Sequence, residues 1–151
     1  MKYLLLTFIV MASAFSSCKS PSSSELPEQG VKGQLYWLEG NQMPGPGKDT
    51  DKRLPVKRKV YICQALTSQQ MQGRQPLFES LPEDEIVEVV KSDVKGVFVA
   101  ELPAGTYSIF TEEEEGFFAN RMNGQGVLNP LVVEQDKLTE TEIVINYKAV
   151  F

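Results

Sequence analysis

Short segments of alternating polar and apolar residues, separated by turns that contain Gly or Pro, constrain this chain more than any other feature. The clearest example is the stretch 93–110, which reads DVKGVFVAELPAGTYSIF. Asp93 can hydrogen-bond to the backbone that follows it and Gly96 can adopt a positive φ, so 93–96 is expected to turn. Leu-Pro-Ala-Gly at 102–105 is expected to form a second turn, because Pro fixes φ and Gly closes the reversal. The stretch therefore predicts two short strands and contains nothing that resembles a catalytic motif.

The two strands of this stretch each present one apolar face. Residues of a strand point alternately to opposite sides of a sheet, which places Phe98 with its apolar neighbours at positions 100 and 102. On the next strand the same rule places Tyr107, Ile109 and Thr111 together. We expect Phe98 or Tyr107 to fill the core between two layers of sheet.

The rest of the chain repeats this pattern. Val60 and Ile62 are expected to face inward in one strand, and Val87 and Val89 in another. The segment 77–81 is either a short edge strand or a plug that places Phe78 in the core. No amphipathic helix of useful length is present, and many short strands at regular spacing are typical of an all-β sandwich or barrel. The further strands are expected at 30–38, 59–66, 86–92, 127–134 and 140–147.

Polar or Gly-rich stretches separate these strands and predict loops at 39–47, 67–76 and 117–126. A run of four acids, 112–115, follows the strand that begins after Gly105. Several carboxylates could hold Ca²⁺, but adjacent residues of an extended chain point opposite ways, and calcium loops space their ligands. We therefore expect 112–115 to be a solvated loop without a metal.

The first 17 residues have the pattern of a secretory signal peptide. A short basic start precedes an apolar run too short to cross a bilayer, followed by small residues. The sequence FSSC that ends at Cys18 resembles the lipobox of bacterial lipoproteins, in a variant with Phe where Leu is common. In that family the equivalent of Cys18 becomes the mature N-terminus and carries lipid, which is the stable membrane anchor we expect here. The alternative is an ordinary signal peptide with a chance cysteine.

The segment 18–29 is rich in Ser and Pro and has almost nothing to bury, as expected of a tether between membrane and domain. The β-sandwich domain is expected to occupy 30–151. The protein is thus expected to be exported and anchored in the cell envelope, most simply at the outer membrane. The face on which it lies is left open by the sequence.

Composition and charge exclude several function classes. The full chain has a formal net charge of −5, and an acidic domain argues against nucleic acid as a partner. No histidine is present, which removes the usual general base and any Ser-His or Cys-His pair. Cys63 lies in an apolar segment without an activating partner and is expected to be a buried, inert thiol. We expect neither an enzyme nor a cofactor.

Two segments carry a family resemblance. VKGQL at 31–35, followed by a Gly/Pro loop, is similar to the opening strand of carboxypeptidase regulatory-like (transthyretin-like) domains. SDVKGVFVAELPAGTYSI at 92–109 is similar to the central hairpin of that family. The resemblance implies a seven-stranded Greek-key, Ig-like or prealbumin-like sandwich, and a non-enzymatic module. The signal and the loop WLEGNQMP at 37–44 also look like small lipoproteins of Bacteroidetes-type bacteria.

A neighbouring family, the collagen-adhesin B-type domains of surface pili, often forms a Lys–Asn isopeptide bond beside a buried carboxylate. Lys32 on the first strand and Asn146 on the last are nominally available for such a bond. However, Glu112 is out of phase by one residue with the inward set that ends at Thr111, and a slip of one residue changes faces. We do not expect the crosslink to form.

The leading hypothesis is an envelope-anchored module that binds or scaffolds a protein or glycan through loops at the end of the sandwich. The alternative reading of Trp37 is a core residue, with the other candidates in ordinary solvated loops. A second hypothesis is a structural subunit of an outer-membrane or surface assembly, docking through a sheet edge or through Phe117 and Phe118. Hydrolysis is disfavoured because no motif places a nucleophile beside a base. The candidate binding residues are Trp37, Glu39, Asn41, Met43, Asn120, Arg121 and Asn123.

Overall fold

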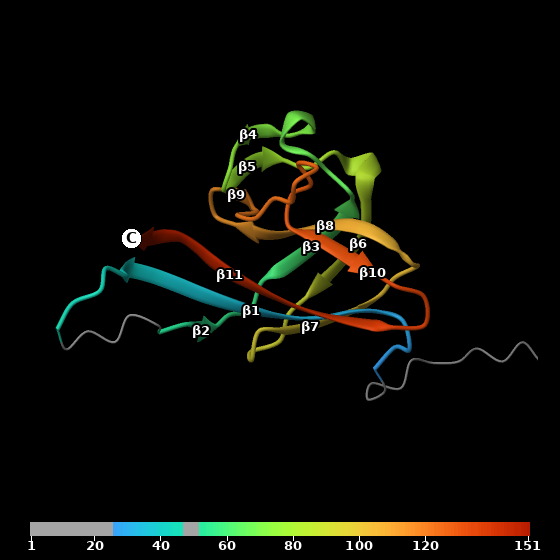
Figure 1. Cartoon of the computed structure of the whole chain (residues 1–151), viewed down its shortest axis with the longest axis horizontal. Helices are drawn as coiled ribbons and strands as arrows, with labels where there is room; N and C mark the ends of the chain where they lie inside the picture. Colours follow the sequence, from blue (N-terminus) through green and yellow to red (C-terminus); the bar gives the residue numbers. More distant parts are fainter. Residues whose placement is uncertain (1–25, 47–51) are drawn as a thin grey trace, which may run out of the picture.

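The computed structural model describes residues 26–46 and 52–151, which form an all-β sandwich of two sheets (Figure 1). The expected signal peptide, Cys18 and most of the expected tether lie outside the described residues. The elements, in chain order, are β1 (Gly30–Asn41), β2 (Leu54–Pro55), β3 (Lys59–Gln64), the 3-10 turn η1 (Ser68–Gln70), β4 (Gln72–Arg74), β5 (Leu77–Ser80), the 3-10 turn η2 (Glu83–Glu85), β6 (Ile86–Lys91), β7 (Val97–Glu101), β8 (Gly105–Glu113), β9 (Gly116–Phe118), β10 (Pro130–Val133) and β11 (Leu138–Val150).

One layer, sheet A, is built around β1. The two long strands β1 and β11 pair in parallel, and Gly30 lies beside Leu138. On its other side β1 pairs with β7 along its first half and with the two-residue β2 further on, both antiparallel. Sheet A therefore consists of a long central strand with β11 at one edge and two short strands end to end at the other.

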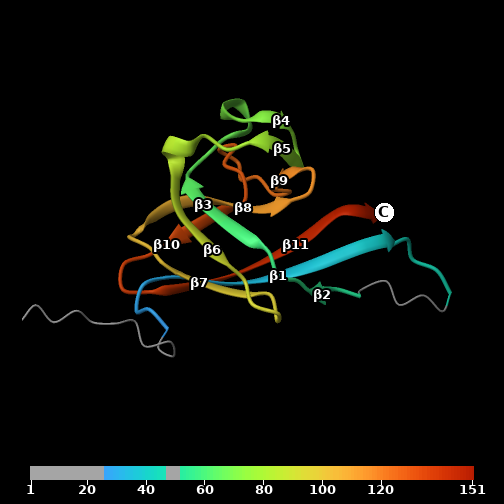
Figure 2. The same cartoon turned by 180° about the vertical axis from the view of Figure 1, so that it is seen from behind.

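The other layer, sheet B, has the order β6-β3-β8. The far side of the long strand β8 pairs with β10 near its start and with β9 near its end. From β9 the sheet continues through β5 to β4, which lie farthest from sheet A in both views (Figures 1 and 2). Every pairing in this sheet is antiparallel, and β6, β4 and β10 each pair with one strand only.

The main core lies between the two sheets. Phe98 is 2% exposed, and its ring lies so close to Gly33 that a Cβ there would be 2.1 Å from Phe98 Cζ. Tyr107 is buried in the same cluster, so both aromatic residues expected in the core are found there. The turn predicted at 93–96, directly before the strand of Phe98, forms as expected. Asp93 Oδ1 accepts hydrogen bonds from the backbone N–H of Lys95 and of Val97, both at 2.8 Å.

A second buried cluster lies on the opposite face of sheet B. Cys63 and Phe110 alternate with residues of the main core and pack instead under β5 and the loops that flank it. Phe78 of β5 is 1% exposed and contacts Phe110 edge to face at 6.2 Å between ring centroids. Phe78 is therefore both part of a short strand and the plug of this second cluster, which confirms its expected burial.

The all-β sandwich is confirmed, with some differences in detail. The two sheets contain eleven strands among the described residues instead of seven, because short segments such as β2, β4 and β9 also pair. Val60 and Ile62 face inward as predicted, and both are fully buried. The expected strand at 127–134 pairs as a strand only from Pro130, because Val127 and Leu128 make isolated bridges.

The assignment of Val87 and Val89 to the inward face is wrong, since they are 37% and 41% exposed. Val90 packs on the main core instead. Opposed residues of an antiparallel pair share a face, and β3 pairs Val90 with the buried Val60 but Val89 with Tyr61, so Val89 faces away from the main core. Val87 lies where the register of the two strands shifts. β6 is also an edge strand of sheet B, so its side chains have a neighbouring strand on one side only and stay more exposed.

The expectation of a solvated loop at 112–115 is also wrong for its first half. Glu112 and Glu113 are the last two residues of β8, and Glu113 is buried. Tyr107, Ile109 and Thr111 share the inward face as predicted, and two more steps of the same alternation reach Glu113. Only Glu114 and Glu115 form the exposed turn before β9.

The strand register separates the two residues considered for an isopeptide bond. Lys32 pairs with Glu140 of β11, and Asn146 lies six residues farther along that strand, roughly 20 Å away at the rise of a β-strand. The Asn146 side-chain oxygen accepts a hydrogen bond from Asn120 Nδ2 at 3.0 Å. Lys32 and Asn146 are therefore too far apart to be joined in this fold.

Candidate functional site

The two sheets separate at one end of the sandwich, where β1 and β11 extend past β9 and β5 (left in Figure 1). A cleft of about 280 Å³ opens there between the inward face of sheet A and the end of β8. We call this hollow the open-end cleft. Its lining comes from three regions, namely the ends of β1 and β11, the segment before β3, and the acidic end of β8. The lining residues are Trp37, Arg58, Glu112, Glu113, Glu114, Tyr147 and Lys148.

Two aromatic side chains from neighbouring strands form the floor of the cleft. Trp37 of β1 and Tyr147 of β11 meet edge to face, with 5.3 Å between ring centroids. Tyr147 also packs against the buried Phe118 of β9, at 5.9 Å, which ties this pair to sheet B. Both rings are only partly buried, so the aromatic floor is continuous with the core on one side and open to solvent on the other.

Two cations lie against the same indole ring. The guanidinium carbon of Arg58 is 5.6 Å from the centroid of Trp37, and Lys148 Nζ is 5.9 Å from it. Lys148 Nζ is also 5.6 Å from the ring of Tyr147. Cation–π contacts of this kind orient long side chains without neutralising them. Among the described residues Lys148 has no salt bridge, so its charge is available to a ligand.

A buried carboxylate joins the two sheets behind these rings. The side chain of Glu113 is 1% exposed, and both of its oxygens lie 3.1 Å from Arg58 Nε. Thr111 Oγ1 donates to one oxygen at 3.0 Å and the Tyr147 hydroxyl to the other at 3.4 Å. A buried charge is tolerated when it is paired and hydrogen-bonded in this way. The network therefore fixes Arg58 and Tyr147 relative to each other at the mouth of the sandwich.

The electrostatics of the cleft affect two titrating groups. Burial raises the pKa of Tyr147, and the nearby carboxylates of Glu113 and Glu115 raise it further. At the rim, a hydrogen bond from Lys59 lowers the pKa of Glu112, which also accepts a hydrogen bond from Tyr61. At neutral pH the cleft therefore presents the neutral hydroxyl of Tyr147 and the ionised Glu112 together with two cations.

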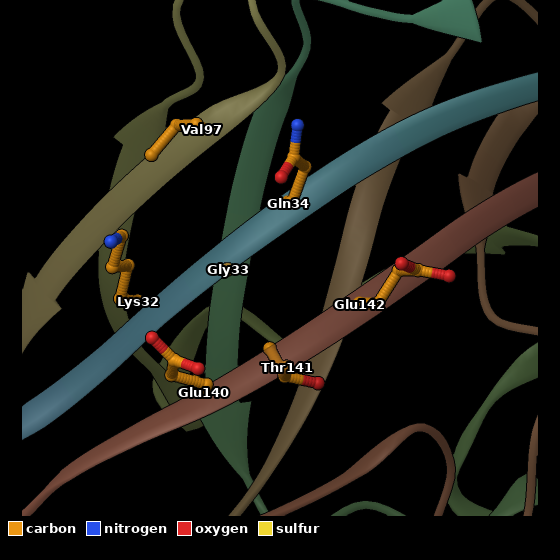
Figure 3. Close-up of a pocket in the computed structure, with 7 residues that line it drawn as sticks. All are labelled: Lys32, Gly33, Gln34, Val97, Glu140, Thr141 and Glu142. Carbon is orange, nitrogen blue, oxygen red and sulfur yellow. The ribbon is translucent and has the colours of Figure 1, made fainter. Parts of the chain in front are cut away.

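A second hollow, the outer furrow, crosses the exposed face of sheet A and has a volume of about 390 Å³ (Figure 3). Lys32 and Gln34 of β1 lie on one side and Glu140 and Glu142 of β11 on the other (Figure 3). Arg53 Nη1 binds the carboxylate of Glu142 at 2.8 Å. The lining is polar and carries both signs of charge, without a large aromatic anchor.

An adjoining groove of about 350 Å³ follows the free edge of β11. Asn120 Nδ2 donates to the carbonyl of Val144 at 3.3 Å, and Arg121 Nη2 donates to the carbonyl of Glu142 at 3.0 Å. These side chains satisfy edge carbonyls that would otherwise be open to another strand. Asn120 and Arg121 therefore cap the β11 edge, a role that their position in a loop did not reveal.

The candidate binding residues from the first loop lie on and beyond the end of β1. Trp37 lines the open-end cleft, whereas Glu39, Asn41 and Met43 are exposed. Asn41 Oδ1 accepts a hydrogen bond from the N–H of Met43 at 2.8 Å, which shapes the loop locally. Trp37 is thus neither a plain core residue nor a loop residue, because it forms the boundary between core and cleft.

The candidates from the late loop fall in different places. Asn120 and Arg121 line the edge groove, while Asn123 Oδ1 accepts hydrogen bonds from its own turn, at Gln125 and Val127. The structure therefore does not bring the two predicted sets into one pocket. Of the Phe117–Phe118 docking surface only Phe117 is partly exposed, because Phe118 is fully buried, and the Phe117 ring packs on Tyr61 with 5.1 Å between ring centroids.

Three residues of the cleft, Arg58, Tyr147 and Lys148, were missed by sequence reasoning. Arg58 belongs to a basic run, Lys57–Lys59, that reads as the solvated start of a strand. Tyr147 shares the alternation of Ile143 and Ile145, which is a usable signal for its inward direction. No local pattern shows that the end of β11 lies beside β1, so the cleft could not be assembled from the sequence.

Comparison with known proteins adds no relative: no family profile, no curated protein and no solved structure matches this chain. Within residues 26–46 and 52–151, no helix is long and apolar enough to cross a membrane. The sandwich fold and the geometry of the open-end cleft are therefore the observations on which a function can be proposed.

Proposed function

We propose that this protein is a lipid-anchored module of the cell envelope that binds a protein or glycan partner without catalysing a reaction. The observation that carries the proposal is the open-end cleft, which joins Trp37, Tyr147 and Arg58 in one solvent-open hollow. Trp, Tyr and Arg are the residues most often found to dominate binding energy at interfaces. A rigid two-sheet scaffold holds all three in place before a ligand arrives, which lowers the entropic cost of binding.

The polar groups of the cleft favour a partner with both donors and acceptors. Lys148 and Arg58 can donate to a carbonyl, hydroxyl or carboxylate, and the exposed Glu114 can accept from a hydroxyl or an amide. Hydroxyl-rich sugars and polypeptide backbones both offer this combination. The aromatic floor supplies the apolar contact that such polar groups alone do not give.

The buried carboxylate supports binding rather than chemistry. Glu113 already accepts hydrogen bonds from Arg58, Thr111 and Tyr147, so its oxygens are occupied by protein donors. Cys63 is fully buried, and burial raises the pKa of its thiol to about 12, which disfavours the reactive thiolate. These features support a module whose charged groups position other side chains.

The membrane anchor in this proposal rests on the sequence that ends at Cys18. A signal-like apolar run, a lipobox-like cysteine and a Ser/Pro-rich tether at 18–29 follow one another in the order that a lipoprotein requires. The proposed location is the outer membrane. The resemblance of 31–35 and 92–109 to carboxypeptidase regulatory-like domains stays a prediction that agrees with a non-enzymatic role.

The binding proposal is tested by exchanging charges at the rim of the cleft. Lys148→Glu and Glu114→Lys change exposed side chains and should leave the fold intact while lowering capture of partners from envelope extracts at least tenfold. Lys137→Glu and Glu134→Lys are matched controls, because they reverse the same charges at the opposite end of β11. Equal capture by cleft and control variants would refute the cleft as the binding surface.

The anchor is tested separately. Cys18→Ser should release the protein from the membrane fraction and remove incorporation of labelled fatty acid. A Cys18→Ser protein that stays in the membrane fraction to the same extent, together with an unlabelled wild type, would contradict lipidation. Neither result bears on whether the cleft binds a partner.

A second candidate function, a structural subunit of a surface assembly, is favoured by one observation. The edge strand β6 exposes two valines and pairs on one side only. Crosslinking in intact cells would distinguish it from the binding module, because a structural subunit should be recovered with one partner in a fixed ratio. Variable or substoichiometric partners would instead support the binding module.

A further inference from the structure

The strand β6 is an open edge of sheet B. It pairs with β3 alone, and within the described part of the chain no side chain bonds its outer carbonyls in the way that Asn120 and Arg121 bond those of β11. Two apolar side chains stand exposed on it, Val87 and Val89. Proteins usually protect an edge of this kind, because unpaired backbone groups and apolar side chains together can template another strand.

The backbone direction of β6 can be followed from its bonds to β3. The N–H of Ser92 donates to the carbonyl of Arg58 at 2.9 Å, so Ser92 points toward β3. Backbone groups alternate in direction along a strand, which turns Val90 and Glu88 toward β3 as well. The N–H and C=O of Val89 and Lys91 therefore point outward, away from sheet B.

Charge is distributed unevenly along this edge. The turn η2 before β6 consists of three acids, Glu83–Glu85. The far end carries the exposed Lys91, with the exposed Lys57 nearby, while Lys59 beside Lys91 on β3 is already paired with Glu112. If a second copy of the strand paired antiparallel with this one, the acidic end of each copy would lie beside the basic end of the other.

We propose that β6 is the interface with a second copy of this chain, which adds an antiparallel β6 and makes sheet B continuous across a two-fold axis at Val89. In this register the two Val89 residues exchange backbone hydrogen bonds, and Lys91 faces Val87 of the second copy. Glu88 then lies opposite Val90. The Val87 and Val89 side chains of both copies share one face and are covered together.

Two requirements favour this register. Directly opposed residues of an antiparallel pair must point to the same face, so the axis must lie on a residue and not between two residues. An axis on Glu88 would place two carboxylates directly opposite each other, which is destabilising. An axis on Val89 avoids this and uses the outward backbone groups. Pairing about a two-fold axis uses both β6 edges and closes, so it gives a dimer and no fibre.

The proposal is tested by oxidative crosslinking, in intact producing cells, of full-chain variants that each gain one cysteine. Val89→Cys places the two sulfurs at the axis, where the expected Cα separation of about 5.5 Å suits a disulfide. Glu88→Cys reports the alternative register. Val132→Cys is the matched control, because Val132 of β10 is an exposed valine, 56% exposed, on a different strand of the same sheet.

The expected result is a disulfide dimer of Val89→Cys at a yield at least tenfold above that of Val132→Cys, with Glu88→Cys well below Val89→Cys. The unmodified chain should give no such dimer, because Cys63 is buried and the proposed lipid occupies the sulfur of Cys18. A Val89→Cys yield no higher than the Val132→Cys yield would overturn the interface. A higher yield for Glu88→Cys than for Val89→Cys would overturn the proposed axis.

A second measurement covers the case in which cysteine substitution disturbs the strand. Val89→Lys puts a charge on the proposed axis and should convert the purified protein from dimer to monomer in sedimentation, with an unchanged far-ultraviolet circular dichroism spectrum. Val132→Lys should leave the dimer intact. A wild-type protein that sediments as a monomer at concentrations up to the millimolar range would overturn the proposal.

Discussion

The space between the two sheets differs sharply between its two halves. At the β7 half it is closed and apolar, and Phe98 packs directly against the backbone of Gly33. At the other half it is open, and Arg58, Glu113 and Tyr147 join the sheets through polar contacts. The same two strands, β1 and β11, provide one wall of both halves. The apolar half can therefore supply the stability that lets the polar half remain open to solvent.

The transition between the halves occurs where the pairing of β1 and β11 becomes irregular. The register shifts between Trp37 and Glu39, so the final residues of both strands no longer follow the alternation that builds the core. Trp37 comes directly before this irregularity on β1, and Tyr147 lies within it on β11. Beyond it the two strands continue as a ribbon without sheet B beneath them (Figure 2).

The strongest test of this difference compares two aromatic truncations on the two halves. Phe98→Ala should lower the free energy of unfolding by about 3–5 kcal/mol, because a fully buried ring is removed. Trp37→Ala should cost less, since its ring is partly exposed and solvent can fill the space. Denaturant titration of both variants measures the two values. A larger loss of unfolding free energy for Trp37→Ala than for Phe98→Ala would show that the open end contributes more to stability than the apolar half.

The next test concerns the contact between Phe98 and Gly33. In Gly33→Ala the new Cβ would lie 2.1 Å from Phe98 Cζ, so the ring must move, at a cost of about 1–3 kcal/mol. Combining Gly33→Ala with Phe98→Leu should cost less than the sum of the two single changes, because the smaller side chain makes room. Additive losses in unfolding free energy would mean that the two residues do not constrain each other.

A comparable loss is expected in the polar half when Glu113 is removed. Glu113→Ala leaves the Arg58 guanidinium, the Tyr147 hydroxyl and the Thr111 hydroxyl without an acceptor, which should cost about 1–3 kcal/mol. Arg58 is partly exposed and can recover water, so the loss should stay below that of Phe98→Ala. The exposed Glu114 is the control, and Glu114→Ala should change the unfolding free energy by no more than about 0.5 kcal/mol.

The smallest expected effect is on the titration of Tyr147. Burial and neighbouring carboxylates raise its pKa, so the unfolded chain loses this proton at lower pH than the folded one. The contribution of Tyr147 to stability is therefore constant below about pH 10 and declines as pH rises above that value. Glu113→Gln should lower the pKa of Tyr147 toward the ordinary value, measured by tyrosinate absorbance. An unchanged Tyr147 titration would mean that Glu113 does not influence the cleft electrostatically.

Local pattern predicted the apolar half well and the polar half poorly. Alternation from Val97 onward placed Phe98 in the core, because each step of that strand is short and regular. The same alternation, continued past Thr111, points to Glu113, but a run of four acids gave a stronger signal for a solvated loop. Glu113 can be buried because Arg58 pairs with its carboxylate. Arg58 lies 55 residues away in the sequence, and no local pattern links it to β8.

The β6 strand shows a different limit. Val87 and Val89 satisfy the pattern of an inward face, yet the pairing with β3 turns Val90 inward beside Val60 and leaves both valines exposed. Which face is buried depends on how two strands are paired, and one strand alone does not reveal it. Likewise, Asn120 and Arg121 were chosen as loop residues suited to binding, and their contact with the β11 edge depends on which strand ends at that edge.

The parallel pairing of β1 with β11 has a consequence for how the molecule is made. Gly30 pairs with Leu138, 108 positions later, so the central strand of sheet A lacks its longest neighbour until almost the whole chain is present. Contacts this distant in sequence slow folding, because a large loop must close before they form. A nascent chain interrupted before Leu138 would carry β1 with one long edge open. The native sandwich is therefore completed only after β11 has been made, and the central strand of sheet A waits for its longest partner until then.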